Sequence, residues 1–368
     1  MDCKQIAILH GKYYNFDSKQ ILIGGIQTYI SNLVELSQQM GYKVAIYQTG
    51  SSKQHTTING CLITELSVKE SNKQSFSNQV AKLCDADLTI YATEGIVPGR
   101  IPFKNAIAIQ HGIYWDMPSK KKHGILYELL TNSIRSYLIH RRIRNMKTVV
   151  CVDYNFINWI RTQNHSLTAH LEAVPNYTPI ANEVEKPVDT INIIFARRLY
   201  WYRGTQVFTQ AIIPILEKYP NVHVTIAGDG PDRAYMHNML KKYPNVEFIT
   251  YQSDESLKIH ADKHIAVVPT VGSEGTSLSL LEAMSSQCAV IASNVGGMTN
   301  IILNGYNGLM VNAGDAASLT RALERLVSDA VLRKKIADNG YETVKEAFSL
   351  RRWQNQWRQI ISQQIDNE

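Results

Sequence analysis

The most chemically informative stretch of the chain is 273–297, which reads SEGTSLSLLEAMSSQCAVIASNVGG. It holds two carboxylates, Glu274 and Glu282, eight positions apart, and it follows an apolar strand-like run at 264–269. Ligands of open α/β sheets bind just beyond the carboxyl ends of strands. The pattern therefore predicts a loop that carries Glu274, followed by a helix that carries Glu282.

Small residues mark the predicted start of that helix. Backbone N–H groups in the first turn of a helix have no partner within the helix and lie at the positive end of its dipole. Such a turn can hold a phosphate or diphosphate group. The residues concerned are Gly275, Thr276, Ser277 and Leu278. A second interpretation stays open, because Ser279-Leu280-Leu281-Glu282 fits a capping box in which Glu282 only closes the helix end.

A pair of cations follows another strand-like run, 191–196. Arg197-Arg198-Leu199 comes first, and Arg203-Gly204 then precedes a periodic apolar segment typical of a helix. Arginine is always charged and binds phosphate through a planar fork of donors. We therefore expect Arg198 and Arg203 to lie near an anionic ligand at the carboxyl end of this strand.

Strand-like runs alternate with helix-length segments along the whole chain, which is typical of a parallel sheet built from β-α-β units. Each half of the chain is expected to form one doubly wound sheet. The first half offers 5–10, 44–48, 88–93, 106–110 and 148–152 as strands, and the second half offers 191–196, 223–227, 246–250, 264–269 and 288–292.

The length of 368 residues suits two domains. The polar, proline-containing segment 176–189 suits a linker between them. We predict an acceptor-side domain at 1–178 and a donor domain at 179–348. A final helix at 349–368, whose Trp353 and Trp357 share one face, is expected to pack back on the first domain.

The segment from Glu274 to Glu282, followed by Ala283-Met284 and Gly296-Gly297, resembles the E-x7-E motif of the retaining glycosyltransferases of family 4. That family has the GT-B fold, in which two Rossmann-like domains face a cleft. The resemblance implies that Glu274 contacts the donor sugar and Glu282 the ribose. Ser277 stands where the family commonly has a second glycine.

The same resemblance extends to the arginine pair and to further residues. The stretch around Arg198 and Arg203 is similar to the family's G-R-L-x-x-x-K-G, in which an arginine and a lysine clamp the diphosphate. Further positions implied to lie near the nucleotide are Gly228 and Gln252. In the first half, Gly24 and Gly25 are implied to approach the donor phosphate, and His111 the reacting carbon. By themselves, the two glycines also fit a flexible turn, and a single histidine a structural role.

The resemblance implies a retaining, metal-independent glycosyltransferase that needs no cofactor beyond its nucleotide-diphosphate sugar, expected to be a UDP-sugar. The expected acceptor is a glycan or a lipid-linked glycan of bacterial-type surface polysaccharide assembly. A nucleotide-sugar epimerase of similar fold and a non-catalytic nucleotide-binding module stay as alternatives. Asp85-Ala86-Asp87 spells a D-x-D, but it precedes a buried strand and is interpreted as structural rather than as a metal site.

The charge of the chain is concentrated in one segment, 120–147, which has eight basic residues and a single acid, Glu128. Leucines and isoleucines alternate with these cations, as in an amphipathic helix. The segment is either a solvated helix face packed on the first sheet or a surface that meets an anionic membrane. No nucleic-acid recognition motif accompanies the charge, so nucleic acid is not an expected partner.

The expected location is the cytoplasm, with possible peripheral attachment at the inner face of the membrane. The N-terminal residues have too short an apolar run for a signal peptide or a membrane span. The five cysteines are scattered, without metal-ligand spacing, which is typical of reduced, buried thiols (Cys3, Cys61, Cys84, Cys151 and Cys288).

Overall fold

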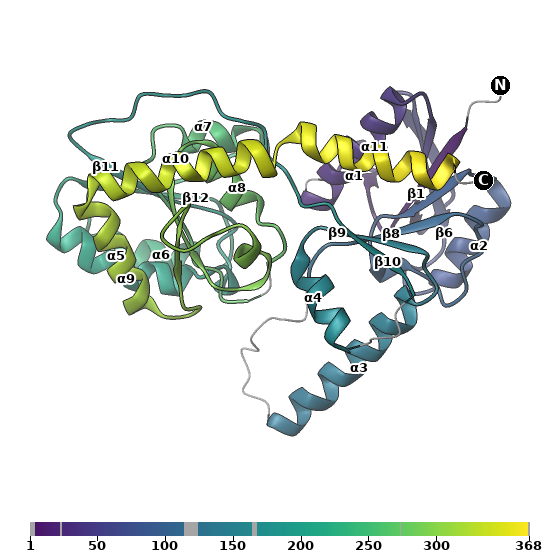
Figure 1. Ribbon diagram of the computed structural model, residues 1–368, viewed down its shortest axis with the longest axis horizontal. Helices are drawn as coiled ribbons and strands as arrows, with labels where there is room; N and C mark the ends of the chain where they lie inside the picture. Colours follow the sequence, from purple (N-terminus) through teal and green to yellow (C-terminus); the bar gives the residue numbers. More distant parts are fainter. Residues whose placement is uncertain (1–3, 23, 114–123, 164–167, 273, 367–368) are drawn as a thin grey trace. The chain divides into compact units, whose positions relative to one another are not determined.

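A computed structural model describes residues 4–22, 24–113, 124–163, 168–272 and 274–366 of the chain. The chain divides into two compact units. Unit 1 contains Met1–His111, Lys122–Val174 and Gln354–Glu368, and unit 2 contains Gly112–Lys121 and Pro175–Trp353. Within each unit, helices cover both faces of one sheet (Figure 1). The predicted α/β fold with two Rossmann-like sheets is confirmed.

The sheet of unit 1 has eight strands in the order β10-β9-β8-β7-β1-β4-β6-β5. The strands are β1 (Gln5–His10), β4 (Lys43–Gly50), β5 (Gln54–Ile58), β6 (Cys61–Ser67), β7 (Leu88–Tyr91), β8 (Ala106–Gln110), β9 (Thr148–Cys151) and β10 (His170–Ala173). All neighbours pair in parallel except β5 and β6. A short separate hairpin joins β2 (Tyr14–Asn15) and β3 (Gln20–Ile21).

Helices connect these strands. They are α1 (Gly25–Gln39), α2 (Lys73–Leu83), η1 (Glu94–Ile96), α3 (Ile125–Ile143) and α4 (Tyr154–Gln163), with α11 (Leu350–Asp366) at the end of the chain. From Gln354 onward α11 belongs to unit 1, where Trp357 is fully buried and donates its indole N–H to the Tyr29 hydroxyl at 2.7 Å. Trp353 lies in unit 2, where its ring centroid is 5.0 Å from that of Tyr177.

The antiparallel edge formed by β5 and β6 departs from the purely parallel sheet expected for this half. The two strands are joined by Asn59-Gly60, and both residues have positive φ, 48° and 77°. Two such residues form the tight turn that fits the twist of a β-hairpin. The Asn-Gly pair was therefore a readable hairpin signal in the sequence.

The sheet of unit 2 has six parallel strands in the order β13-β12-β11-β14-β15-β16. These are β11 (Ile191–Ala196), β12 (Val222–Ala227), β13 (Val246–Ile249), β14 (Ile265–Val268), β15 (Ala289–Ser293) and β16 (Leu309–Val311). The five strands predicted from the sequence are all present, and β16 is additional. Its three residues are too short a run to stand out as a strand.

Helices cover both faces of this second sheet. They are η2 (Trp201–Arg203), α5 (Thr205–Lys218), α6 (Arg233–Leu240), η3 (Ser253–Glu255), α7 (Ser256–His260), α8 (Leu278–Ser285), η4 (Gly296–Asn300), α9 (Ala316–Ser328) and α10 (Ala330–Ala347). One core, on which α5, α6 and α9 pack, includes Phe208 and Leu323. The other, on which α8 and α10 pack, includes Leu281 and Val344.

Each sheet has a point at which the strand order reverses. In unit 2 the chain proceeds outward from β11 through β12 in one direction and from β14 through β15 in the other. In unit 1 the same reversal lies between β1 and β7. In α/β sheets generally, the connections after the two central strands run in opposite directions from such a point, and ligands bind in the crevice beside it.

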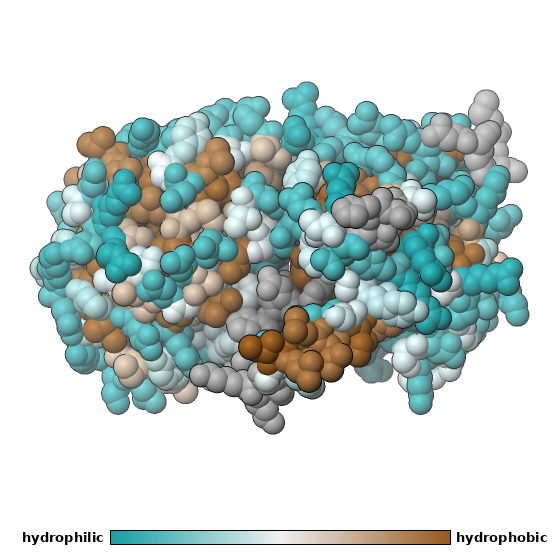
Figure 2. Space-filling model, turned by 60° about the horizontal axis from the view of Figure 1, so that its bottom comes forward, coloured by the Kyte–Doolittle hydropathy of each residue, from teal (hydrophilic) through white to brown (hydrophobic). Residues whose placement is uncertain are grey.

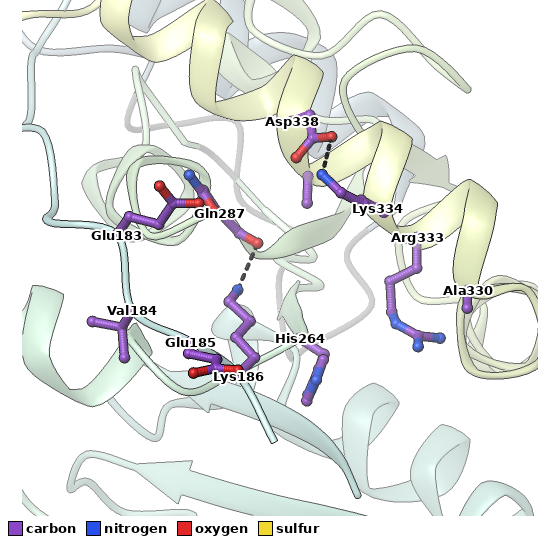
Figure 3. A pocket seen from close by; sticks show the side chains of 11 residues that line it. Glu183, Val184, Glu185, Lys186, His264, Gln287, Ala330, Arg333, Lys334 and Asp338 are labelled. Atoms are coloured by element: carbon purple, nitrogen blue, oxygen red, sulfur yellow. Dashed lines mark hydrogen bonds and ion pairs between the residues drawn. The ribbon is translucent and has the colours of Figure 1, made fainter. Parts of the chain in front are cut away.

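Lys186 helps to hold the polar segment before β11 on unit 2. The Lys186 ammonium donates to the carbonyl oxygen of Gln287 at 2.6 Å (Figure 3). It also donates to the carbonyl oxygens of Ser286, at 3.1 Å, and of Lys263. Ser286 and Gln287 directly follow α8, so the ammonium pairs carbonyl groups at a helix end. Burial lowers the pKa of Lys186.

Lys186 also lines a surface pocket of about 310 Å³. The other lining residues come from the linker, from α10 and from the chain just before β14 and just after α8, and they include His264, Gln287, Arg333 and Lys334 (Figure 3). None of the residues that the sequence predicts for the functional site is among them. This pocket therefore lies where the linker packs beside α10, and we do not assign it to the functional site.

Lys186→Met should destabilise unit 2 by about 1–3 kcal/mol, because it leaves buried carbonyl groups without their donor. Lys334→Met is the matched control. Lys334 lines the same pocket but forms an exposed ion pair with Asp338 at 2.6 Å, and such pairs contribute little. Urea unfolding followed by circular dichroism measures both variants. Equal effects of the two substitutions would contradict the anchoring role of Lys186.

Candidate functional site

Two loops of unit 2 meet at the point where its strand order reverses. One follows β11 and runs through Arg203, and the other follows β14 and runs to α8. The backbone N–H of Val271 donates to the carbonyl oxygen of Tyr202 at 2.9 Å, which joins the loops directly. The sequence therefore brings residues about seventy positions apart to one place.

Glu274 is the centre of this loop pair. One of its oxygens, Oε2, accepts hydrogen bonds from Arg197 Nη2 at 3.1 Å, from Thr270 Oγ1 at 3.0 Å and from Arg203 Nη1. Its side chain is only 11% exposed. The carboxylate is thus buried, and the two cations that its charge requires come from the other loop.

Arg197 is a site residue that the sequence reasoning missed. Its guanidinium group is 5% exposed and reaches both Glu274 and the hydroxyl of Thr270. Burial lowers the pKa of Arg197, and Glu274 opposes that shift by favouring the charged form. Two adjacent arginines look alike in a sequence, and only the path of the loop decides which one points inward.

The charges fix the ionisation state of Glu274. Burial alone would raise the pKa of this carboxyl group, but Arg197 and Arg203 outweigh burial and hold its pKa below the ordinary value of 4.5. Glu274 is therefore an anion at neutral pH. It cannot donate a proton there, and it can accept hydrogen bonds from hydroxyl groups.

Arg198 lies apart from this ion pair. It is exposed, and its guanidinium carbon is 5.9 Å from the centre of the Tyr200 ring. Arg203 similarly lies 5.2 Å from the centre of the Tyr202 ring, while one of its nitrogens binds Glu274. The structure thus brings Arg203 and Glu274 together, whereas Arg198 is a separate exposed cation on the same loop.

Glycines allow the loops to approach this closely. A Cβ atom on Gly296 would lie 2.1 Å from the carbonyl oxygen of Glu274, and one on Gly228 would lie 2.2 Å from that of Arg197. Both glycines have positive φ, 51° and 136°. Any larger residue at Gly296 would push the chain after β15 away from the Glu274 loop, and one at Gly228 would push the end of β12 away from Arg197. Gly228 thus supports the Arg197 backbone from the end of β12.

The helix α8 begins at Leu278, and its N-cap residue is Ser277. A capping box would need its glutamate three residues after the N-cap, which is Leu280 and not Glu282. The Glu282 carboxylate instead accepts a hydrogen bond from the Ser256 hydroxyl at 2.6 Å. The capping-box interpretation of Glu282 is therefore wrong.

Glu282 differs from Glu274 in its electrostatics. Burial raises the pKa of Glu282 above 4.5, and the hydrogen bond from Ser256 offsets only part of that effect. Glu274 binds two arginines, whereas the carboxylate of Glu282 is held by a neutral hydroxyl group. The same residue type at eight-residue spacing is thus placed in two opposite environments.

The predicted anion-binding turn lies beside Glu274. Thr276 and Ser277 are buried, and the Thr276 carbonyl accepts from the Asn176 side chain at 2.9 Å. Gly275 precedes them, and a Cβ on Gly297 would lie 2.6 Å from the carbonyl carbon of Gly275. The first turn of α8 therefore starts in a fixed position, with its positive dipole end near the Glu274 loop.

Gln252 is exposed at the end of the loop after β13. Its backbone N–H donates to the Glu255 carboxylate at 2.8 Å, and its carbonyl oxygen accepts from the Glu255 N–H at 3.0 Å. Contacts of the Gln252 backbone with a nucleotide would therefore compete with these local bonds.

Unit 1 holds the three other predicted residues at the carboxyl side of its own sheet. Gly24 is the N-cap residue of α1, and Gly25 is its first residue. His111 directly follows β8, and its Nε2 lies 2.8 Å from the carbonyl oxygen of Ala92, just past β7. The Tyr29 ring meets the imidazole edge-on at 5.4 Å.

His111 is neutral at pH 7. Burial lowers the pKa of His111 to about 4, although the bond to Ala92 opposes this shift. A carbonyl oxygen only accepts, so Nε2 carries the proton and donates to Ala92. Nδ1 of the neutral ring is then an acceptor. His111 can orient a hydroxyl group, but it supplies no positive charge.

The D-x-D segment has a structural role in unit 1. Asp87 accepts the backbone N–H of Gln5 at 2.6 Å through its Oδ2, which fixes the entry of β1 next to β7. Within the described ranges, no group of three or more His, Cys, Asp or Glu side chains is arranged to hold a metal ion.

The second unit matches a known family. Residues 177–343 match the family described as Glycosyl transferases group 1. A relative in Rhizobium meliloti, the lipopolysaccharide core biosynthesis glycosyltransferase LpsE, is 27% identical over 170 residues, which are 45% of this chain and 48% of LpsE. The chain spans less than half the length of several such curated relatives.

Solved structures show the fold of the whole chain. Sucrose-phosphate synthase from Thermosynechococcus elongatus has a TM-score of 0.76 at 17% identity, covering 99% of this chain and all of the other. Anabaena HepE, solved in complex with UDP and glucose, has a TM-score of 0.71 at 13% identity, covering 98% of this chain and 99% of its own. The predicted GT-B fold class is confirmed.

Glu274→Gln should lower the free energy of unfolding of unit 2 at pH 7 by about 3–5 kcal/mol, because Arg197 is left buried without a counter-charge. The wild-type contribution is present above pH 4.5 and is lost as the pH falls through the lower folded-state pKa. The free energy of unfolding of the variant should therefore fall less steeply than that of wild type as the pH is lowered. Urea unfolding between pH 3 and pH 8 measures this.

Glu282→Gln is the matched control. The folded-state pKa of Glu282 is raised, so its contribution is present at low pH and is lost as the pH rises through that value. This variant should become more stable relative to wild type as the pH rises. If the free energy of unfolding of the two variants changed with pH in the same way, the opposite environments of Glu274 and Glu282 would be contradicted.

Proposed function

We propose that this chain, whose residues 177–343 match the glycosyl transferases group 1, is a retaining glycosyltransferase. It would move a sugar from a nucleotide-diphosphate sugar to a glycan or lipid-linked acceptor in the assembly of a bacterial-type surface polysaccharide. The observation that carries the proposal is the buried Glu274 carboxylate, held by Arg197, Arg203 and Thr270 beside the start of α8.

The charges of this site suit a diphosphate sugar. The loop after β11 carries three arginines, two of which bind the single buried carboxylate, so the loop pair has an excess of positive charge. A diphosphate would take up that excess at Arg203 and at the exposed Arg198, with the first turn of α8 as a further donor. Glu274, which is fully ionised, would accept hydrogen bonds from the sugar hydroxyls, and Glu282 would accept from the ribose.

Catalysis would be electrostatic. As the bond between the anomeric carbon and the diphosphate oxygen breaks, negative charge grows on the departing phosphate. Cations and N–H groups already fixed in place stabilise that charge without reorganisation. The arginines would supply the positive charge that a divalent metal supplies elsewhere, so no metal is required. The acceptor hydroxyl would attack on the face from which the nucleotide leaves and pass its proton to the departing phosphate oxygen, and attack on that face gives retention.

The nucleotide is proposed to be a uridine nucleotide. The HepE structure, with a similar fold, was solved with UDP and glucose. LpsE, which is similar over part of the second unit, takes part in lipopolysaccharide core biosynthesis by its name. Unit 1 would supply the acceptor side, with Gly24 and Gly25 near the donor phosphate. The neutral His111 would orient a hydroxyl group. The proposed location is the cytoplasm.

An epimerase of similar fold would also bind a nucleotide sugar, but it needs carboxyl groups that exchange protons near neutral pH. Glu274 is poorly suited to that role, because its pKa lies below 4.5. A panel of nucleotide sugars is first screened by thermal shift, and stabilising compounds are then incubated with the protein without acceptor. An epimeric nucleotide sugar among the products would contradict the transferase proposal.

Arg198→Ala should lower kcat for sugar transfer or donor hydrolysis by about 10²-fold, as expected for the loss of one group that stabilises the leaving phosphate. Because Arg198 is exposed, its loss should leave the melting temperature unchanged. Arg161 is also exposed and lies on α4. Arg161→Ala is therefore the control and should keep wild-type kcat. NMR of the product establishes its anomeric configuration, and assays with EDTA test the need for metal. Unchanged kcat in Arg198→Ala would refute the assigned role.

A further inference from the structure

The helix α3 of unit 1 leaves most of its large apolar side chains uncovered. Eight of them are between 39% and 77% exposed: Ile125, Leu126, Tyr127, Leu129, Leu130, Ile134, Tyr137 and Leu138. In this helix only Ile139 and Ile143, near the C-terminal end, are buried. The expected apolar face packed on the sheet is therefore limited to the last turns, and the first turns do not follow that expectation.

Six of the eight exposed residues form a stripe along one side of the helix. Leu126, Leu130, Ile134 and Leu138 repeat every four positions, which places them on one side of a helix. Tyr127 and Tyr137 lie within this stripe, whereas Ile125 and Leu129 lie outside it. The opposite side carries polar residues, among them Glu128, Asn132 and Arg135. We call the stripe with its two tyrosines the apolar face of α3.

Figure 2 shows hydrophobic side chains gathered at the place where α3 comes forward. Single exposed leucines are common on protein surfaces, but contiguous apolar patches indicate an interaction site. Burying such a face in an apolar phase gains free energy in proportion to its area. The apolar face therefore requires a partner that is itself apolar.

The charge of the same segment identifies that partner. Arg141, Arg144 and Lys147 are exposed at the C-terminal end of α3 or just after it, and the sequence adds Lys120, Lys121 and Lys122, which lie outside the described residues. Arginine and lysine can extend their apolar stems and keep the charged end in water. A partner that is apolar in depth and negatively charged at its surface matches both properties.

We propose that α3 docks unit 1 onto the surface of an anionic lipid bilayer, lying in the plane of the interface with its apolar face toward the acyl chains. Tyrosine suits the boundary between lipid and water, because its ring is apolar and its hydroxyl polar. None of the helices in the described parts of the chain is long and apolar enough to span a membrane. The helix would therefore lie on the bilayer rather than cross it.

A second copy of the chain fits this face less well. Pairing two α3 helices would bring two segments of like positive charge together, which opposes association. Acidic lipid headgroups instead neutralise these cations. The charge complementarity therefore favours the lipid surface over self-association.

The experiment uses the full chain and sedimentation with two kinds of vesicle, phosphatidylcholine alone and phosphatidylcholine with phosphatidylglycerol. We expect binding to the anionic vesicles that weakens as salt is raised, and little binding to the neutral ones. Replacing Arg141 and Arg144 by glutamine should weaken partitioning about fivefold for each cation.

Ile134→Glu tests the apolar face and should lower partitioning onto anionic vesicles by about tenfold or more. Asn132→Glu is the matched control, since it adds the same charge to the same helix on the opposite side. It should lose no more than about fivefold, the effect of one charge. Both positions are exposed, so the melting temperature and circular dichroism of each variant should equal those of wild type.

Three results would overturn the proposal. The first is equal partitioning of Ile134→Glu and Asn132→Glu, and the second is absence of wild-type binding to anionic vesicles. The third is a wild-type dimer in light scattering that Ile134→Glu dissociates, which would assign the face to a second copy. Because vesicle binding needs no sugar donor, failure here leaves the proposed transferase activity untouched.

Discussion

The second unit depends on one buried carboxylate. Glu274 is nearly excluded from water, and an isolated ion in that position would cost several kcal/mol. Arg197 and Arg203 make the position tolerable, but they add two positive charges to neutralise one. The fold therefore satisfies the carboxylate and retains a positive excess at the same place. An anionic ligand would complete the charge balance that the protein leaves open.

This ion pair dictates the backbone around it. The loops after β11 and β14 must come close enough for Arg197 to reach Glu274, and they can do so only where the strand order reverses. Gly228 and Gly296 stand where a Cβ would strike the carbonyl oxygens of Arg197 and Glu274. These glycines thus let the chain after β12 and after β15 pack closely against the two loops that hold the ion pair.

Periodicity predicted most of the fold, and the residue contacts are what it could not predict. Strands such as β11 and β15 are continuous apolar runs, so their hydrophobic pattern was sufficient. The family resemblance assigned Glu274 and Arg203 to one donor site, and the structure brings the two side chains together. Arg197 was missed because local sequence does not show which of two adjacent arginines turns inward. The role of Glu282 was ambiguous for a similar reason, since its partner, Ser256, is 26 positions away.

The helix α3 shows a second way in which this sequence departs from the simplest folding rule. A helix that only had to cover a sheet would bury leucines and isoleucines along its whole length. In α3 the buried contacts end near Ile139, while the apolar residues continue toward Ile125. Such a surface favours self-association in water, and the surrounding cations oppose it by mutual repulsion. The same cations would attract an acidic lipid surface, so one set of charges can keep α3 apart from its copies and direct it to a membrane.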